Sequence, residues 1–506
     1  MKLLATSLGA WDTIEAGQRH RHGSTFPLAI LAAVLAECGY PAPECWEGDV
    51  RPAGRGRDYD LLLVSVMDSR HFWRLPPWLR EIGCPVRATD RGDADPIVVV
   101  GGQAATAPAP IEPFADIVYV GEAEAHVPDL MRTLESARGA GRSRTRTLEA
   151  VAAIPGCLVP THRPAGHVVQ QVYADDIGTT LRERLSVNHR AIHRVEIARG
   201  CKSRCGFCAL GWRAPYRENS ATDIEAALRS TREAGIREVH LSAGDAEGHS
   251  EIVQLRSAVA ALGLRDHGWT GRLDTVRDCS VSAGKQFAFG LEGASWRLRR
   301  AIGKPRLTDD FVIAAVAEYW QSGGRRLMLH LIGGLPTETD TDGAALADLL
   351  DRLAYAAGGV GERIHIQIGR QPFGPLPHTP MQWFAPGLST ERIGRAIARH
   401  VGGASLAAVD KAGQGVPAAL LNAIVMRGGP EVSSLVEAGP PRLPRDPRFA
   451  RAAAASWLRG AGLNPDHYWG AWDPDAPTPW DHVRSAHSPA MLRRQWGRIR
   501  DLLLGT

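Results

Sequence analysis

The sequence has no long hydrophobic run. Its apolar stretches stop well short of the ~20 residues that a membrane-spanning helix needs. The first segment, "MKLLATSLGAWDTIEAGQ", is too short in its apolar part for a secretory signal and soon reaches charged residues. We therefore expect a cytoplasmic protein with no membrane partner.

The sequence also has little excess charge and very little lysine. A formal net charge of +4 over 506 residues gives no strong case for a polyanion partner, so nucleic acid remains open but unsupported. Only five of the 59 lysine and arginine residues are lysine. An arginine excess suits phosphate or carboxylate ligands, although genomic base composition is the simpler explanation.

Cysteine is scarce, and three of the eight cysteines are clustered in "ARGCKSRCGFCALGWRAPYREN". In a reducing compartment, clustered cysteines indicate metal binding or catalysis rather than disulfides. The other five show no ligand spacing, and we expect small buried hydrophobes there: Cys38, Cys45, Cys84, Cys157 and Cys279. Cys279 alone falls in the second half of the fold, where a role as hydrogen donor stays open.

The cluster of Cys201, Cys205 and Cys208 lacks a fourth cysteine nearby. Structural zinc sites use four ligands, and the nearest histidine, His193, lies back on the preceding predicted strand. Three thiolates on one loop suit an iron–sulfur cube that leaves one iron open for a substrate. Zinc with a distant fourth ligand, or three unrelated thiols, are the alternatives.

The first part of the chain alternates buried strand patterns with helical patterns. Its strand-like runs are "KLLATS", "YDLLLVSVM", "PIVVVGG" and "ADIVYVGEAEA". Such continuous apolar runs between helices predict a doubly wound parallel sheet over residues 1–138. We expect a linker with a few short strands over 139–188.

From His193 the alternation of strands and helices begins again. Six strands with helical crossovers predict a partial parallel (β/α)6 barrel over residues 189–386. Glycine and polar residues gather where these strands end, which is the active face of this architecture. After about Pro386 the pattern weakens, and residues 387–506 are expected to form a small mixed C-terminal extension. Two or three domains fit the chain length.

The cysteine loop resembles the signature of the radical S-adenosylmethionine (radical SAM) superfamily, C-x3-C-x2-C with an aromatic residue before the last cysteine. Phe207 fills that place. The resemblance implies a 4Fe–4S cluster on Cys201, Cys205 and Cys208, with S-adenosylmethionine chelated at the open iron. Reductive cleavage would then release a 5′-deoxyadenosyl radical. An electron donor of the flavodoxin or ferredoxin type is implied as a partner.

Later strand ends also resemble parts of this family. In "LSAGDAEG", Ser242, Gly244 and Asp245 stand where the family binds the methionine amino group, usually with two glycines and a glutamate. At two further strand ends the resemblance implies cofactor contacts: Glu292 and Ser295 at the ribose and carboxylate, and Ile332 and Gly333 at the adenine. Arg297 and Arg299 could meet the carboxylate, although positions on the helix surface are the plainer reading.

The first domain resembles the cobalamin-binding-like domain that often precedes such a barrel. Gly101, Gly102 and Ser65 occupy the places of its glycine edge and of a serine that contacts the nucleotide tail. The D-x-H-x-x-G motif that supplies a cobalt ligand is absent. His20 and His22 are present in the corresponding loop, but the residues around them do not form this motif. Either cobalamin binds without a protein ligand to cobalt, or the fold persists without the cofactor. A dinucleotide site is disfavoured because no G-x-G-x-x-G turn is present.

The tail segments "FGPLPHTPMQW" and "PWDHV" resemble a subgroup that joins these two domains to a C-terminal extension. Four residues of these segments are candidates for a substrate site, with packing of the extension as the alternative: His378, Trp383, Asp481 and His482. The sequence does not identify a substrate.

The resemblance implies an enzyme that begins by forming an adenosyl radical. One hypothesis is a transferase that moves a methyl group with cobalamin as carrier. A second is cobalamin-independent rearrangement or modification of a nucleotide, a nucleic acid or a natural-product intermediate. A hypothesis of another class is a non-catalytic metal-binding or redox module.

Overall fold

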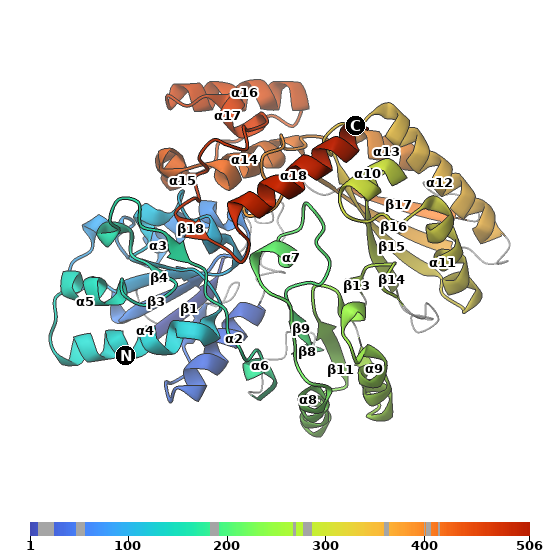
Figure 1. Ribbon diagram of the computed structural model, residues 1–506. Helices are drawn as coiled ribbons and strands as arrows, with labels where there is room; N and C mark the ends of the chain where they lie inside the picture. The colour runs from blue at the N-terminus through green and yellow to red at the C-terminus, as the bar shows by residue number, and fades with distance from the viewer. Residues whose placement is uncertain are drawn as a thin grey trace.

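A computed structural model describes residues 1–8, 25–46, 56–182, 192–266, 270–276, 286–358, 364–398, 400, 406–412 and 415–505. Its ribbon shows an N-terminal sheet with its helices, a second set of strands and helices beside it, and C-terminal helices lying across both (Figure 1). The predicted loop with His20 and His22, and Cys279, lie outside the described residues.

The N-terminal part is a six-stranded sheet of order β2-β1-β3-β4-β5-β6. The first five strands are parallel, and the sixth is antiparallel. The strands are β1 (Leu3–Ser7), β2 (Glu44–Trp46), β3 (Leu61–Ser65), β4 (Ile97–Gly101), β5 (Ile117–Tyr119) and β6 (Cys157–Leu158). The doubly wound parallel sheet predicted from the apolar runs is confirmed.

Helices cover both faces of this sheet. One face packs on α2 (Thr25–Glu37), α4 (Ala123–Gly139) and α5 (Arg144–Val151), which contribute Leu35, Leu130 and Leu148 to one buried core. The other face packs on α3 (Leu75–Glu81), with Trp78 and Leu79 in a second core. Because strand residues alternate between faces, β3 sends Leu63 to one core and Leu62 to the other.

The segment expected to be a linker is partly built into this sheet. Helix α5 packs against α4, and β6 adds the antiparallel edge strand. Farther on, β7 (Val169–Gln170) pairs with β18 (Val483–Arg484) near the end of the chain. The buried side chains of Val151 and Leu158 explain why this stretch folds onto the domain rather than spanning a gap.

The second part contains the six predicted strands, all in parallel pairings. They form a three-stranded sheet of order β12-β11-β8 and a five-stranded sheet of order β13-β14-β15-β16-β17. The strands are β8 (Ile192–Glu196), β11 (Glu238–Ser242), β12 (Arg265–Asp266), β13 (Thr270–Gly271), β14 (Gln286–Glu292), β15 (Arg326–Gly333) and β16 (Ile364–Pro372). The predicted partial parallel barrel is therefore confirmed. Its third predicted strand, "TGRLDTV", contains β13, and β12 is a short additional strand that lies before it.

Helices cover one face of the two sheets that make up the partial barrel (Figure 1). They are α8 (Ala221–Glu233), α9 (Ile252–Ala261), α10 (Trp296–Ala301), α11 (Asp309–Gln321), α12 (Asp340–Gly358) and α13 (Glu391–Ala398). On β15, Leu327, Leu329 and Leu331 are buried in a core shared with α10, α11, α12 and α13, whereas α8 and α9 pack in a separate core. Since side chains alternate along a strand, Met328 and His330 face the opposite, concave side.

A seventh strand was not recognised from sequence. Strand β17 (Leu406–Ala412) pairs in parallel with β16 and lies within the range expected to be the C-terminal extension. Its sequence, LAAVDKA, is poor in β-branched residues and carries a weak strand signal. The unpaired edge of β16 supplies the backbone partners that local propensity does not reveal.

The C-terminal helices connect the two parts. They are α14 (Val416–Arg427), α15 (Ser433–Ala438), α16 (Pro447–Gly460), α17 (Pro465–Trp469) and α18 (Pro489–Leu504). Val425 and Val436 are buried in an N-terminal core, whereas Ile499 and Leu503 of α18 join the barrel core against α10. Figure 1 shows α18 crossing from the N-terminal side toward α10.

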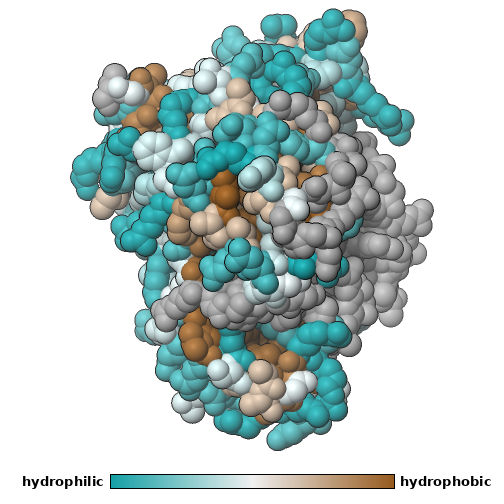
Figure 2. All heavy atoms as spheres, turned by 90° about the vertical axis from the view of Figure 1, so that its right-hand side faces the viewer, coloured by the Kyte–Doolittle hydropathy of each residue, from teal (hydrophilic) through white to brown (hydrophobic). Residues whose placement is uncertain are grey.

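The surface has a mixed but mainly polar character. The face turned to the viewer in Figure 2 is largely hydrophilic, with hydrophobic atoms in smaller areas between. Among the described residues, none of the helices has the length and apolarity to cross a bilayer.

Candidate functional site

The cysteine loop begins where the first barrel strand ends. It follows β9 (Ala198–Arg199) and leads into α7 (Leu210–Arg213), and β9 pairs with β10 (Arg217–Glu218). Gly200, at the turn, has a φ of +79°, and a Cβ there would lie 2.5 Å from the carbonyl oxygen of Pro215. Only glycine fits this turn without displacing the hairpin.

Backbone hydrogen bonds hold the loop from three sides. The amide of Gly206 donates to the carbonyl of Ile302 at 3.0 Å, and Trp212 Nε1 donates to the carbonyl of Cys205 at 2.9 Å. From the C-terminal part, the amide of Met381 donates to the carbonyl of Gly206 at 3.2 Å. The loop is therefore fixed before any ligand binds.

All three cysteines of the loop are free thiols; Cys205 is buried, and Cys201 and Cys208 are half-buried. Burial raises the pKa of Cys201 and of Cys205, and it raises the pKa of Cys208 to about 11. Negative charge on Cys205 and Cys201 contributes to the raised pKa of Cys208, so both thiols interact electrostatically with the third. Thiolates at these positions would need positive charge nearby, from basic residues or from a bound metal.

A structural zinc site uses four ligands, whereas this loop carries three cysteines. Within the described ranges, no three histidine, cysteine, aspartate or glutamate side chains are grouped as ligands of one ion. An iron–sulfur cube places each thiolate on a different iron, so its ligands stand farther apart than ligands around one zinc. Three cysteines on one loop suit the cube better than a closed zinc site.

A basic residue that sequence reasoning missed touches the loop. Arg272, just after β13, donates from Nη1 to Cys205 Sγ at 2.8 Å. Asp274 holds the same guanidinium through two hydrogen bonds of 2.9 and 2.8 Å, and Nη2 also reaches the carbonyl of Gly303. In the sequence, only the position of Arg272 in the third predicted strand indicated that it could lie near the loop.

A second basic residue, Lys304, lies in the same neighbourhood and was also missed. Its buried Nζ donates to the carbonyl of Gly290 at 2.6 Å and to Glu292 Oε1 at 3.2 Å. The charges of Lys304 and Arg272 both act to lower the pKa of Cys205 against the effect of burial. Two cations therefore stand beside one thiol of the loop.

The second strand end lies directly against the cysteine loop. A Cβ on Gly244 would come 2.9 Å from the carbonyl oxygen of Gly200 and 3.5 Å from Cys201 Cβ, so this close approach depends on glycine. Asp245 is buried and accepts from Thr275 Oγ1 at 3.1 Å. Ser242 Oγ accepts from Arg194 Nε at 2.8 Å. Of the three predicted residues, Gly244 lies closest to the loop.

The fourth and fifth strand ends are partly near the loop. Glu292 has a φ of +65° at a bulge of β14, and its carboxylate pairs with Lys304. Ser295 is the N-cap of α10 and donates its hydroxyl to Asp342, which leaves it turned to the helix. Arg297 also pairs with Asp342.

The remaining predicted positions have packing contacts. A Cβ on Gly333 would meet Thr390 within 3.0 Å, while the neighbouring Ile332 is half-buried. Phe207 packs against the barrel core. Arg299 is fully buried and paired with Asp309, so the helix-surface position expected for it is wrong.

A cavity lies between the edge of the N-terminal sheet and the cysteine loop. It measures about 280 Å³ and is lined by the three residues predicted for cobalamin, Ser65, Gly101 and Gly102, and by Leu210 and Arg213 of α7. Ser65 and Gly101 stand opposite each other in the register of β3 and β4. A Cβ on Gly102 would lie 2.6 Å from the carbonyl of Val66, so the edge must be glycine.

Two polar atoms that line this cavity have no hydrogen-bond partner among the residues that the structure describes. Ser65 Oγ and Gln171 Oε1 are buried without a hydrogen bond, and both residues line the cavity. A buried polar atom left unpaired costs about 1–3 kcal/mol, so these atoms mark places where a ligand would donate or accept. No histidine is among the described residues of the lining.

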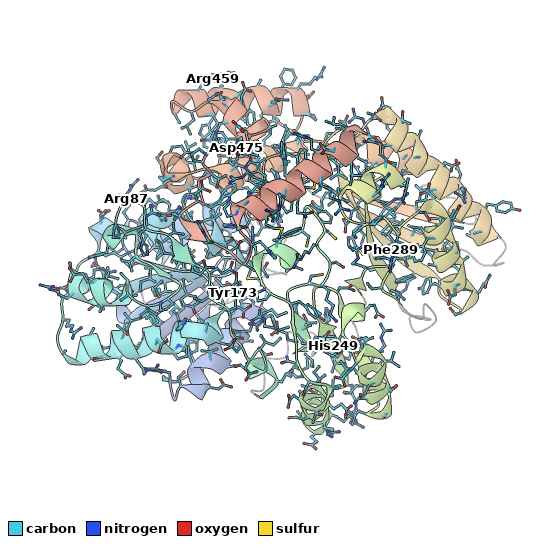
Figure 3. The ribbon with its side chains drawn as sticks, viewed as in Figure 1. Arg87, Tyr173, His249, Phe289, Arg459 and Asp475 are labelled. Carbon is cyan, nitrogen blue, oxygen red and sulfur yellow. The ribbon has the colours of Figure 1, made fainter. Side chains whose placement is uncertain are left out.

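Ion pairs join the N-terminal domain to the loop beside this cavity. Arg199, directly before Gly200, pairs with Glu124 at 2.8 Å and with Glu196 at 2.7 Å. Arg217 of β10 pairs with Glu122 at 2.6 Å. At the same junction, where Figure 3 labels Tyr173, the hydroxyl of that residue donates to the carbonyl of Arg213 at 2.6 Å.

The four tail residues make packing contacts, and their role in a substrate site stays a prediction. His378 is fully buried at a φ of +58°, and its Nε2 lies 2.8 Å from the carbonyl oxygen of Thr106. Trp383 is buried against Trp496. The carboxylate of Asp481 accepts hydrogen bonds from the amide and the hydroxyl of Thr478. His482 pairs with Glu112 of the N-terminal domain at 2.6 Å.

Two family models match this chain. The model described as the radical SAM superfamily matches residues 195–350, which contain the cysteine loop. The model for the N-terminal region of radical SAM proteins matches residues 54–160.

Curated relatives are similar over part of their length. The uncharacterised protein MJ0966 of Methanocaldococcus jannaschii is 28% identical over 192 residues, or 37% of this chain and 42% of that protein. The ribosomal protein uS12 methylthiotransferase RimO of Cutibacterium acnes is 25% identical over 327 residues, or 61% of this chain and 62% of that protein. The chain thus spans less than two thirds of either relative.

Solved structures with a related arrangement are distant. The radical S-adenosylmethionine methyltransferase TsrM of Kitasatospora setae, solved with cobalamin and a [4Fe-4S] cluster, is 14% identical with full coverage of both chains and a TM-score of 0.49. The cobalamin-dependent radical enzyme OxsB is 13% identical, with coverage of 93% of this chain and 64% of that chain and a TM-score of 0.42.

Proposed function

Because this chain belongs to the radical SAM superfamily, we propose that it is an enzyme that cleaves S-adenosylmethionine reductively to begin a radical modification of its substrate. The observation that carries the proposal is the fixed loop of Cys201, Cys205 and Cys208 at the end of the first barrel strand. A 4Fe–4S cluster bound there would supply the electron that breaks the sulfonium bond.

The residues around the loop fit such a centre. Three thiols lie on one short loop, and Arg272 and Lys304 add positive charge beside Cys205. These cations would favour the thiolate form of a ligand whose pKa is raised by burial. The close contact of Gly244 with the loop leaves no room for a side chain, so the backbone of the second strand end can approach a bound cosubstrate.

The concave face of the sheet would hold the cosubstrate and substrate. Roles for Glu292, Asp245, Ile332 and Gly333 in binding S-adenosylmethionine stay part of the proposal, supported by the position of Glu292 beside Lys304. Ser242 and Ser295 already have protein partners, so they would have to exchange these to bind a ligand. Phe207 would shield the loop from water through its packing on the core.

We further propose that the cavity at the sheet edge binds cobalamin without a protein ligand to cobalt. The unpaired Ser65 Oγ and Gln171 Oε1 support a polar ligand in a mainly apolar space. The cavity also adjoins α7 of the cysteine loop, so a methyl carrier there would lie next to the radical site. Methyl transfer is therefore the favoured reaction, and cobalamin-independent modification is the alternative if no corrinoid binds.

The proposal includes a reductant, an unidentified substrate and a cytoplasmic location. The seven cysteines that the structure describes are free thiols, which supports a reducing compartment. Anaerobic reconstitution with iron and sulfide tests the cofactor assignment. We expect about four iron atoms per chain and a visible iron–sulfur absorption band. A stoichiometric zinc ion, or no metal at the loop, would support the non-catalytic alternative.

A further inference from the structure

A groove of about 390 Å³ lies beside the cysteine loop. It lies on the other side of the loop from the cavity proposed to bind cobalamin. Helix α7 separates the two spaces, because its Leu210 and Arg213 line the cavity whereas its Trp212 lines the groove. The other walls come from the end of α10 and from α18. A molecule in this groove would leave the cavity and the concave face of the barrel free.

The groove is strongly basic. Arg204, Arg300 and Arg498 line it from the loop, from α10 and from α18, and all three are exposed. None of them forms an ion pair with another residue that the structure describes, and no carboxylate is among the described lining residues. Arg204 and Arg300 stack near the rings of Trp212 and Trp296 instead. Three uncompensated charges on one small surface attract an acidic partner.

The floor of the groove is the backbone of the cluster loop itself. Gly206 lines it, and a Cβ on Gly303 would lie only 3.2 Å from Cys205 Cα. Ile499 and Leu502 of α18 add apolar surface beside these glycines. A basic rim around a small apolar floor is the form of a transient protein interface. Electron transfer falls steeply with distance, and this surface is separated from a cysteine ligand by one layer of backbone.

We propose that this groove docks a small acidic one-electron carrier protein of the flavodoxin type. The inference rests on the proposed function, because it gives the carrier a cluster to reduce. In the complex the carrier loses one electron and the cluster gains it, with no proton or group transferred. Docking behind the loop lets reduction proceed while the cosubstrate occupies the opposite side.

The test compares two reductants on the cluster-loaded protein. The double variant R300E/R498E reverses two charges of the groove, and R459E reverses one exposed charge on α16, at the far side of the C-terminal helices in Figure 3. Cluster reduction is followed by its visible absorption, without S-adenosylmethionine, using either reduced flavodoxin or dithionite. At low salt we expect R300E/R498E to slow reduction by flavodoxin at least about tenfold. Dithionite rates and R459E should stay within about twofold of wild type.

Two results would overturn the docking proposal. One is an unchanged rate of cluster reduction of R300E/R498E by flavodoxin. The other is an equal loss of the reduction rate with dithionite, which is expected if the groove binds an anionic substrate or stabilises the fold. A wild-type protein that assembles no cluster would refute the proposed function instead. Calorimetric binding of flavodoxin to cluster-free wild type and R300E/R498E would still test the groove, and equal affinity would reject it.

Discussion

The guanidinium of Arg272 lies against the thiol of Cys205, with Nη1 2.8 Å from Sγ, and Asp274 holds it there. A positive charge at this distance from a cluster ligand stabilises the reduced, more negative state. Because the pair is mostly buried, solvent screens the charge only weakly. Arg272 therefore acts as a positioning and tuning residue for the proposed cluster.

We predict that R272Q/D274N lowers the midpoint potential of the cluster. The double change avoids leaving a buried carboxylate unpaired. Loss of the contact with Cys205 should shift the potential by roughly 30–60 mV, or about 1 kcal/mol, toward negative values. A redox titration monitored by electron paramagnetic resonance measures this shift.

The control for this prediction is the exposed pair of Arg448 and Asp446, which has the same spacing in sequence and the same type of contact. R448Q/D446N should leave the potential unchanged. An unchanged potential in R272Q/D274N would show that the guanidinium does not tune the centre.

Ser65 and Ser7 provide a matched pair for the cobalamin proposal. They are neighbours in the register of β3 and β1, and both hydroxyls are buried without a partner. Only Ser65 is among the residues that line the cavity. We predict that S65A weakens cobalamin binding by roughly 3–10-fold, the value of one hydrogen bond, whereas S7A leaves it unchanged.

Titration of each protein with cobalamin, followed by visible absorption, checks this prediction. Both substitutions should leave the free energy of unfolding unchanged or raise it by up to about 1 kcal/mol, because each removes an unsatisfied hydroxyl. Equal affinities of wild type and S65A would remove Ser65 from the site. Failure of wild type to bind would favour the cobalamin-independent alternative.

His378 should make stability depend on pH. Burial and the charge of Arg213 lower its pKa to about 3 from an ordinary value of 6.5. The folded chain therefore binds fewer protons than the unfolded chain between these values, and stability falls as pH drops from about 6.5 toward 3. The expected slope inside this window is about 1.4 kcal/mol per pH unit.

The variant H378N removes this titration and suits the positive φ of the site, which asparagine tolerates. Urea unfolding at about pH 7, 6 and 5 compares the two proteins. Between about pH 6 and 5 we expect wild type to lose about 1 kcal/mol more than H378N. Parallel losses in both proteins would mean that His378 is not the responsible group.

The buried parallel strands and the cysteine loop could be predicted from sequence because their signals are local, whereas the order of the strands in each sheet could not. Apolar runs such as "PIVVVGG" report buried parallel strands, and the C-x3-C-x2-C spacing needs no tertiary information. The glycine at Gly244 was likewise identified by its place at a strand end. Its proposed contact with a cosubstrate stays a prediction.

The basic residues around the loop could not be predicted in the same way. Arg272 and Lys304 lie 67 and 99 positions beyond Cys205, and only the curvature of the sheet brings them beside it. Ser295 shows the opposite difficulty, because a serine at a strand end can face a ligand or cap a helix. The structure has it capping α10.

The central claim is that the three-cysteine loop holds a cluster that cleaves S-adenosylmethionine. The most direct measurement is 5′-deoxyadenosine formed from S-adenosylmethionine by anaerobically reconstituted protein with dithionite. We predict product from wild type and from C38A, whose cysteine is half-buried in the N-terminal part, and at least about 100-fold less from C205A. Equal product from C205A and wild type, or none from wild type carrying a full cluster, would contradict the account.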